Sequence, residues 1–167
     1  MALEERPKNS HSRSCLASGL TASRFATSIQ QNAVKLQLLF IGKPRNREAN
    51  LLAQEYAGRI KHYCKFEMVR LKDEKAARAY GRVVKVVLDP AGDQMTSREL
   101  ASFLEKTTQD VAFFVGGAEG FSGEFRASAD RLISLSKMTL PHELARVILA
   151  EQIYRAFTIL RGHPYPR

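Results

Sequence analysis

The sequence predicts an α/β layer fold with a mostly parallel sheet, and three observations support this prediction. Short apolar runs recur along the chain, helical patterns lie between them, and Gly, Pro or Asp ends several of the runs. Strands that alternate with helices usually pair in parallel and are covered by helices on both faces. At 167 residues the chain has the length of one ordinary domain.

The first predicted strand covers residues 35–41, whose sequence KLQLLFI is followed by Gly42 and Pro44. Residues 47–61 form the first predicted helix. The apolar residues at helical spacing in this segment are Leu51, Leu52, Tyr56 and Ile60.

The next two predicted strands are joined by a short charged link. Residues 65–71 alternate apolar and charged side chains, which is typical of a half-buried or edge strand. The link runs from Lys72 to Arg82, and residues 83–88 then form a buried strand. Three turn residues follow that strand: Asp89, Pro90 and Gly92.

A capping box predicts the start of the second helix. Thr96 and Glu99 have the T-x-x-E spacing that satisfies free N–H groups at a helix start. The apolar run 111–115 is a further buried strand, and residues 123–131 are predicted as a helix.

The C-terminal part contains a short strand and a loop that ends at Leu140, then a long helix. We expect Thr139 to cap this helix, with Pro141 in its first turn and Glu143 near its positive dipole end. Residues 147–150 are apolar in succession, which is wider than a single core-facing stripe. A homodimer partner or a tighter core within one chain would cover the additional side, and both remain open.

Composition favours a polyanionic partner. The formal charge is +9 and the pI is near 9.8, as expected for a protein that neutralises nucleic-acid phosphates; a merely solvated basic surface is the alternative. No apolar stretch reaches the roughly 20 residues of a membrane helix, so we expect no membrane association. The two cysteines, Cys15 and Cys64, lack a CxxC or metal-ligand spacing, which favours a reducing compartment and no metal site.

Residues 1–33 are predicted to be a disordered extension, because they are rich in Ser, Ala and Thr and lack a continuous apolar pattern. Arginines among serines are typical of an organelle transit peptide, whereas the acidic residues Glu4 and Glu5 are not. Our hypothesis is that the start codon is wrongly assigned and that Val34 is the true start, which leaves a single domain at 34–167.

The stretch VGGAEGFSGEF suggests a ligand site. Gly116, Gly117 and Gly120 follow a buried strand, where parallel sheets bind ligands and where glycine allows close backbone approach. The alternative is a purely structural turn with Ser122 as the helix N-cap. The spacing lacks both G-x-G-x-x-G and Gly-Lys-Ser/Thr, which argues against a nicotinamide dehydrogenase and a phosphate loop.

Three segments, FFVGGAEGFS, LSKMTLPHELARVILAEQIYRAF and the terminal HPYPR, resemble the RlmH family of bacterial ribosomal RNA methyltransferases, which belong to the SPOUT class. The resemblance extends from Lys35 to Arg167. It implies a SPOUT-type α/β fold with a C-terminal trefoil knot, a cytoplasmic homodimer and S-adenosylmethionine as cofactor. It also implies methylation of N3 of a pseudouridine in 23S rRNA of the ribosome.

Site residues are carried over from the resemblance by position. The cofactor-binding residues it implies are Leu88, Gly116, Leu135, Ser136, Lys137, Met138, Thr139 and Leu140. The tail combines positive charge with aromatic faces, as binding to RNA requires, through Arg161, His163, Tyr165 and Arg167. The resemblance implies that the tail of one subunit completes the pocket of the other. The candidates for orienting the base or assisting proton loss are His142, Tyr165 and Arg167.

The chain departs from the family pattern at two places. The link from Lys72 to Arg82 is shorter than usual, and Pro166 replaces a terminal histidine, so any proton transfer falls to His142, His163 or Tyr165. These departures motivate an alternative function, a catalytically weakened RNA- or ribosome-binding protein of the same fold. The sequence does not identify the general base or the RNA footprint.

Overall fold

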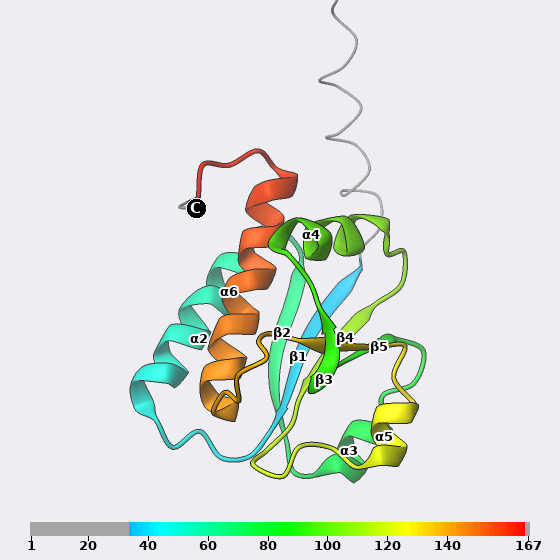
Figure 1. Cartoon of the computed structure of the whole chain (residues 1–167). Coiled ribbons are helices and arrows are strands. Elements are labelled where there is room, and N and C mark those ends of the chain that lie inside the picture. The colour runs from blue at the N-terminus through cyan, green and yellow to red at the C-terminus, as the bar shows by residue number, and fades with distance from the viewer. Residues whose placement is uncertain (1–33, 166–167) are drawn as a thin grey trace, which may run out of the picture. The chain divides into compact units, whose positions relative to one another are not determined.

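The computed structural model describes residues 34–165, and they form a five-stranded sheet in the order β2-β1-β4-β3-β5 (Figure 1). Every neighbouring pair of strands is parallel, which confirms the predicted fold class. The strands are β1 (Lys35–Ile41), β2 (Lys65–Leu71), β3 (Val84–Gln94), β4 (Val111–Val115) and β5 (Arg131–Ser134). The helices are α2 (Arg47–Ile60), α3 (Glu74–Arg78), α4 (Ser97–Lys106), α5 (Gly123–Ala127) and α6 (His142–Leu160). The predicted disorder of residues 1–33 lies outside the described residues, and the trefoil knot stays a prediction.

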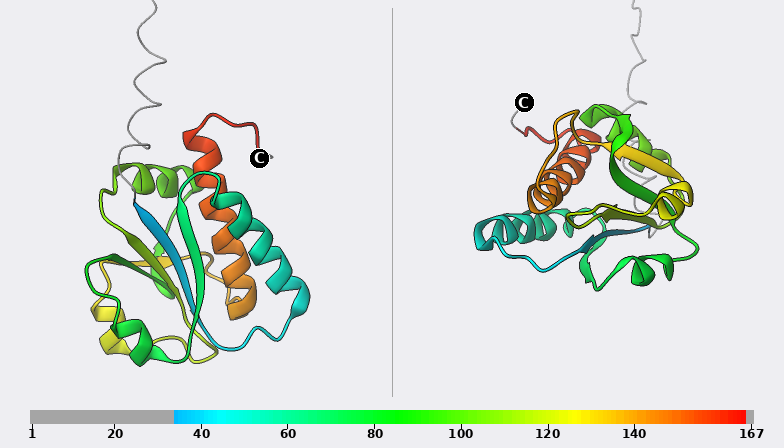
Figure 2. Two further views of the ribbon diagram at one scale, coloured as in Figure 1. Left: turned by 180° about the vertical axis from the view of Figure 1, so that it is seen from behind. Right: turned by 60° about the horizontal axis from the view of Figure 1, so that its bottom comes forward.

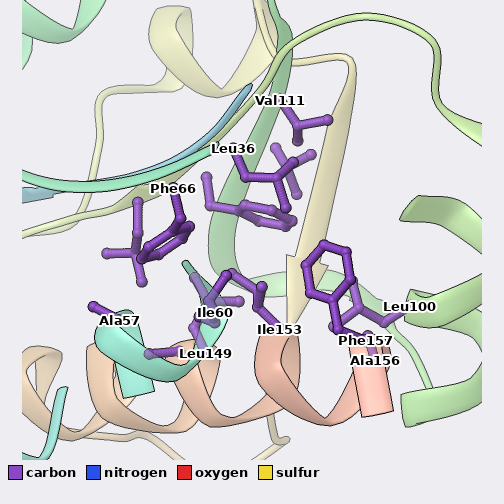
Figure 3. Close-up of a cluster of buried hydrophobic side chains, with 14 of the residues drawn as sticks. Leu36, Ala57, Ile60, Phe66, Leu100, Val111, Leu149, Ile153, Ala156 and Phe157 are labelled. Carbon is purple, nitrogen blue, oxygen red and sulfur yellow. The ribbon is translucent and has the colours of Figure 1, made fainter. Parts of the chain in front are cut away.

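Helices cover both faces of the sheet (Figure 2), and each face has its own core. One core joins Leu38 and Phe113 of the sheet to α2, α4 and α6, and Figure 3 shows part of it. The other core joins Leu39 and Phe114 to the short helices α3 and α5 through Ala77 and Phe125. Both faces of β1 and β4 are buried. Because successive strand residues point to opposite faces, β4 is apolar throughout and β1 is mostly apolar.

Helix α6 packs against α2, α4 and the sheet, and this position explains its wide apolar surface (Figure 1). Val147 contacts the α2 side through a small cluster with Ala49 and Ala53, whereas Leu149 and Ile153 face the main core. Burial within one chain therefore accounts for much of the 147–150 run. A partner subunit is not required to explain it.

Strand β3 is longer than the sequence predicts, because it continues past the turn residues to Gln94. Ile133 of β5 pairs with both Leu88 and Asp93, so the segment between these residues bends across β5. The backbones approach so closely that a Cβ at Gly92 would lie 2.6 Å from the Ile133 nitrogen. Long-range contact with β5 therefore decides this conformation.

The predicted helix 123–131 is too long, since α5 ends at Ala127. The Ser128 hydroxyl donates to the Phe125 carbonyl, which closes the last turn. Asp130 already pairs with β3: its backbone N–H donates to the Lys85 carbonyl, and its carboxylate accepts from the Lys85 N–H at 2.7 Å. The remaining residues are consequently drawn into β5.

Gly92→Ala should lower the free energy of unfolding by about 2 kcal/mol or more, because the new methyl group would overlap the β5 backbone. Urea unfolding of the purified variant measures this loss. Gly58→Ala in α2 is the matched control: no atom lies within 4 Å of its Cβ position, so it should stabilise by roughly 0.5–1 kcal/mol. Equal stability of Gly92→Ala and the wild type would contradict the crossing.

Candidate functional site

A cavity of about 560 Å³ lies at the carboxyl ends of the central strands. Four segments contribute most of its wall: residues 88–91, 115–121, 133–136 and 138–140. Arg126, His142 and Ala145 complete it. The chain thus brings the glycine loop and the loop before α6 together, although about twenty residues separate them in sequence.

Most of the sequence-predicted residues line this cavity. From the implied cofactor set these are Leu88, Gly116, Leu135, Ser136, Met138, Thr139 and Leu140, and His142 joins them. Lys137 is absent from the wall, and Tyr165 lies elsewhere. Arg167 is outside the described residues. The binding and catalytic roles of all these residues stay predictions.

The glycine loop is a tight turn as well as a cavity wall. The Gly120 N–H donates to the Gly117 carbonyl at 3.1 Å, and Gly120 has φ +70°. A Cβ at Gly116 would lie 2.9 Å from the Gly120 Cα, so the turn closes only without that side chain. The structural interpretation of these glycines is therefore correct, and the same closure leaves main chain facing the cavity.

The loop before α6 is stabilised internally. The Ser134 hydroxyl donates to the Ser136 carbonyl, and the Met138 N–H donates to the Ser136 hydroxyl at 3.0 Å. Thr139 does not cap α6, which corrects the prediction: Pro141 is the N-cap and makes no side-chain hydrogen bond. The Met138 side chain is 78% exposed, an unusual position for an apolar residue beside a cavity.

The start of α6 is tied to the loop after β1. The Glu143 carboxylate accepts from the backbone N–H groups of Arg45 and Asn46, and the bond from Asn46 is the main reason that its pKa is lowered. This contact fixes the helix end that carries His142. The His142 Nε2 atom would lie 3.7 Å from a Cβ at Gly42.

Arg146 is a buried charge that the sequence analysis did not identify. Its side chain is 1% exposed, its guanidinium lies 4.3 Å from the centre of the Phe40 ring, and burial lowers its pKa. Nε and Nη2 have no hydrogen-bond partner among the described residues. The available signal was a single arginine within the apolar run LARVILA.

Tyr165 packs against the far part of α6. Its ring is 5.0 Å from that of Tyr154 and 4.7 Å from the Arg155 guanidinium, and its hydroxyl is 3.4 Å from that of Tyr56. Burial raises the pKa of Tyr165. Tyr154 is roughly 18 Å along the helix from His142 at 1.5 Å per residue. Within one chain, Tyr165 and His142 therefore do not meet.

Comparison with known proteins gives consistent matches. The family described as predicted SPOUT methyltransferase matches residues 34–166. A protein of Geobacter sp. (strain M21) named ribosomal RNA large subunit methyltransferase H is 44% identical over 151 residues, covering 79% of this chain and 98% of the relative. A protein of the same name from Solibacter usitatus is 43% identical over 139 residues, covering 80% of this chain and 100% of the relative.

Solved structures agree in fold. A probable methylase family protein from Haemophilus influenzae matches with a TM-score of 0.52 and 11% identity, covering 78% of this chain and 67% of that protein. A probable methyltransferase from Bordetella pertussis matches with a TM-score of 0.50 and 14% identity, covering 77% of this chain and 97% of that protein.

Among residues 34–165, no helix is long and apolar enough to span a membrane.

The short link between β2 and β3 holds the glycine loop in place. Glu74 of α3 accepts from both the N–H and the hydroxyl of Ser122, each at 2.7 Å, and Arg78 pairs with Glu74 and Glu124. The Ser122 N–H is the main reason that the pKa of Glu74 is lowered. The short link is therefore attached at Ser122, the residue next to Phe121 of the cavity wall.

Glu74→Gln should destabilise the protein by about 1 kcal/mol at neutral pH, because charge-assisted hydrogen bonds become neutral ones. A lowered pKa means that the carboxylate stabilises the fold above its ordinary value of about 4.3 and loses this effect as pH falls through the lowered value. The difference from the wild type, measured by urea unfolding at pH 7 and pH 3, should shrink in acid. Glu105→Gln, at an exposed position, is the control, and a pH-independent difference would contradict the anchor.

Proposed function

The chain belongs to the SPOUT methyltransferase family, and from this premise we propose that it methylates 23S rRNA at N3 of a pseudouridine. One observation carries the proposal: relatives named ribosomal RNA large subunit methyltransferase H align over 98% of their length at 44% identity. The match therefore spans nearly the whole length of these relatives. The +9 charge suits an RNA substrate, and an rRNA substrate in turn favours a cytoplasmic location.

S-adenosylmethionine is the cofactor of this enzyme, and the cavity fits it. A volume of about 560 Å³ lies within the usual range for ligand pockets. Leu88, Met138 and Leu140 would enclose the adenine, while the glycine loop offers main chain without side chains in front of it. When bound, the cofactor would supply the methyl group of its sulfonium. The methyl group would leave the sulfur, and the bonding electron pair would stay on the sulfur.

The protein must remove the N3 proton and align the base. His142 lines the cavity, and an imidazole nitrogen can act as a general base, so we assign proton acceptance to His142. Pro166 stands where the family has a histidine, which increases the importance of His142. Tyr165 and Arg167 are assigned to holding the base and its phosphate. Alignment of two bound reactants accounts for much of the expected acceleration.

The separation of these groups supports a homodimer, given the role assigned to Tyr165. His142 belongs to the cavity, whereas Tyr165 lies on Tyr154 at the other part of α6, so one chain does not assemble both. The tail of a second copy would supply Tyr165 and Arg167 to the cavity. Exposed apolar side chains beside it, Met138 at 78% and Leu144 at 47%, are available to contact that copy.

The alternative, a weakened RNA-binding protein, depends on the shortened link. The link contains α3, whose Asp73 N-cap accepts from the Ala76 N–H, and Glu74 anchors the glycine loop. Leu88 remains in the cavity wall. The short link therefore leaves the cavity formed, which favours the enzyme.

The deciding experiment is transfer of labelled methyl from S-adenosylmethionine to ribosomes that lack this modification, followed by mapping of the labelled nucleotide. We expect label at a pseudouridine of 23S rRNA. Ribosome binding without label, at saturating cofactor, would refute the enzyme and support the alternative. Ribosomes that already carry the modification are the control.

Truncation after Gly162 should spare cofactor binding and reduce methylation at least about 100-fold, because base-orienting groups are lost. A Gly116→Val chain should fail to bind cofactor, since its side chain disrupts the turn. Mixing the two inactive proteins should restore activity if the tail works in the second subunit. Normal activity of the truncated protein alone, or no recovery in mixed dimers, would contradict this arrangement.

A further inference from the structure

One oppositely charged pair lies in the wall of the cavity and has no assigned role. Asp89 follows Leu88, at the start of the segment of β3 that bends between its two paired parts. Arg126 belongs to α5. Both line the cavity, and among residues 34–165 Arg126 is the single lysine or arginine in its wall. Arg126 Nη1 lies 3.3 Å from Asp89 Oδ2, while Asp89 Oδ1 accepts from the Ala91 N–H at 2.9 Å.

This pair is only partly satisfied. A strong ion pair has N to O distances of about 2.7–2.9 Å and often uses two parallel hydrogen bonds. Here a single longer contact uses Nη1, and Nε of Arg126 is buried without a hydrogen-bond partner among the described residues. The Arg126 side chain as a whole is 41% exposed, so its terminal nitrogens, unlike Nε, can reach a ligand, and a guanidinium matches both oxygens of a carboxylate. The carboxylate of Asp89, whose side chain is 11% exposed, also retains unused acceptor positions.

A ligand that matches this site must carry both charges. A simple anion would approach Arg126 against the repulsion of Asp89 and of Glu119, which also lines the cavity. A zwitterion avoids this cost, because its cation faces Asp89 while its anion faces Arg126. The amino-acid end of S-adenosylmethionine, with one ammonium and one carboxylate, has this charge pattern.

We propose that Asp89 and Arg126 form the subsite for the amino-acid end of S-adenosylmethionine. Arg126 binds the carboxylate through its terminal guanidinium nitrogens, and Asp89 accepts from the ammonium. The inference rests on the proposed function, since it assigns the polar end of the same cofactor. Under this proposal the pair would distinguish the complete cofactor from molecules that lack its amino-acid end. The other walls of the cavity are largely apolar or main chain.

Calorimetry on the full chain with three probes tests this subsite. S-adenosylmethionine carries the complete amino-acid end, its decarboxylated form lacks only the carboxylate, and 5′-methylthioadenosine lacks the whole end. The wild type should bind S-adenosylmethionine roughly 10-fold or more tightly than the decarboxylated form, the scale of a bidentate charge-assisted bond. Arg126→Met should abolish this preference and leave 5′-methylthioadenosine binding unchanged.

Further variants separate binding from folding. Asp89→Asn should weaken S-adenosylmethionine binding and spare 5′-methylthioadenosine. Arg126→Lys keeps the charge but lacks the planar guanidinium, so it should retain part of the preference, and it serves if Arg126→Met does not fold. Arg98→Met, at an exposed position of α4 outside the cavity wall, removes the same charge and should change nothing.

Two results would overturn the assignment while leaving the proposed function intact. One is equal wild-type affinity for S-adenosylmethionine and its decarboxylated form. The other is a uniform loss for all three probes in Arg126→Met, which would show that the pair only shapes the cavity. If the wild type bound none of the probes at millimolar concentration, the proposed function itself would fail, and this subsite with it.

Discussion

The contact on which the site depends is the passage of the main chain at Gly92 across β5. Ile133 pairs with both Leu88 and Asp93, and no side chain separates the two backbones. This crossing sets the direction in which residues 88–91 leave the sheet, and it fixes the point from which the loop before α6 departs. Two of the cavity walls therefore depend on one contact, and the glycine loop follows β4, the other neighbour of β3 in the sheet.

The sheet is supported unequally on its two faces. The long helices α2, α4 and α6 cover one face with a large core, whereas α3 and α5 are five residues each and cover the other. Hydrogen bonds compensate on the thin face: Glu74 binds Ser122, and Arg78 joins Glu74 to Glu124. The cavity thus lies beside the face covered by α3 and α5, which relies most on polar contacts. Small changes in loop position on this face expose little apolar surface.

Local patterns predicted most of the regular structure. β1, β2 and β4 have the predicted bounds because turn residues or charges flank each run, and the Thr96 capping box forms with both of its hydrogen bonds. Local patterns failed where distant contacts decide, as in the continuation of β3 through Pro90 and the early end of α5. The loops that form the cavity were also identified, but Asp89 with Arg126 and the buried Arg146 were not. An ion pair across 37 residues leaves no periodic signal, and neither does the burial of one arginine.

The crossing at Gly92 also governs how the protein responds to mechanical load. A pull on the C-terminal helix passes through the loop of residues 135–141 to β5, and β5 is held against the bent segment of β3 by main-chain contact. Resistance at that point comes from the shape of the backbone rather than from the hydrophobic core. An unfolding motor that engages this end must first pull Leu149, Ile153 and Phe157 of α6 out of the main core, and it then meets the crossing beside the cavity, where a bound ligand would add to the resistance.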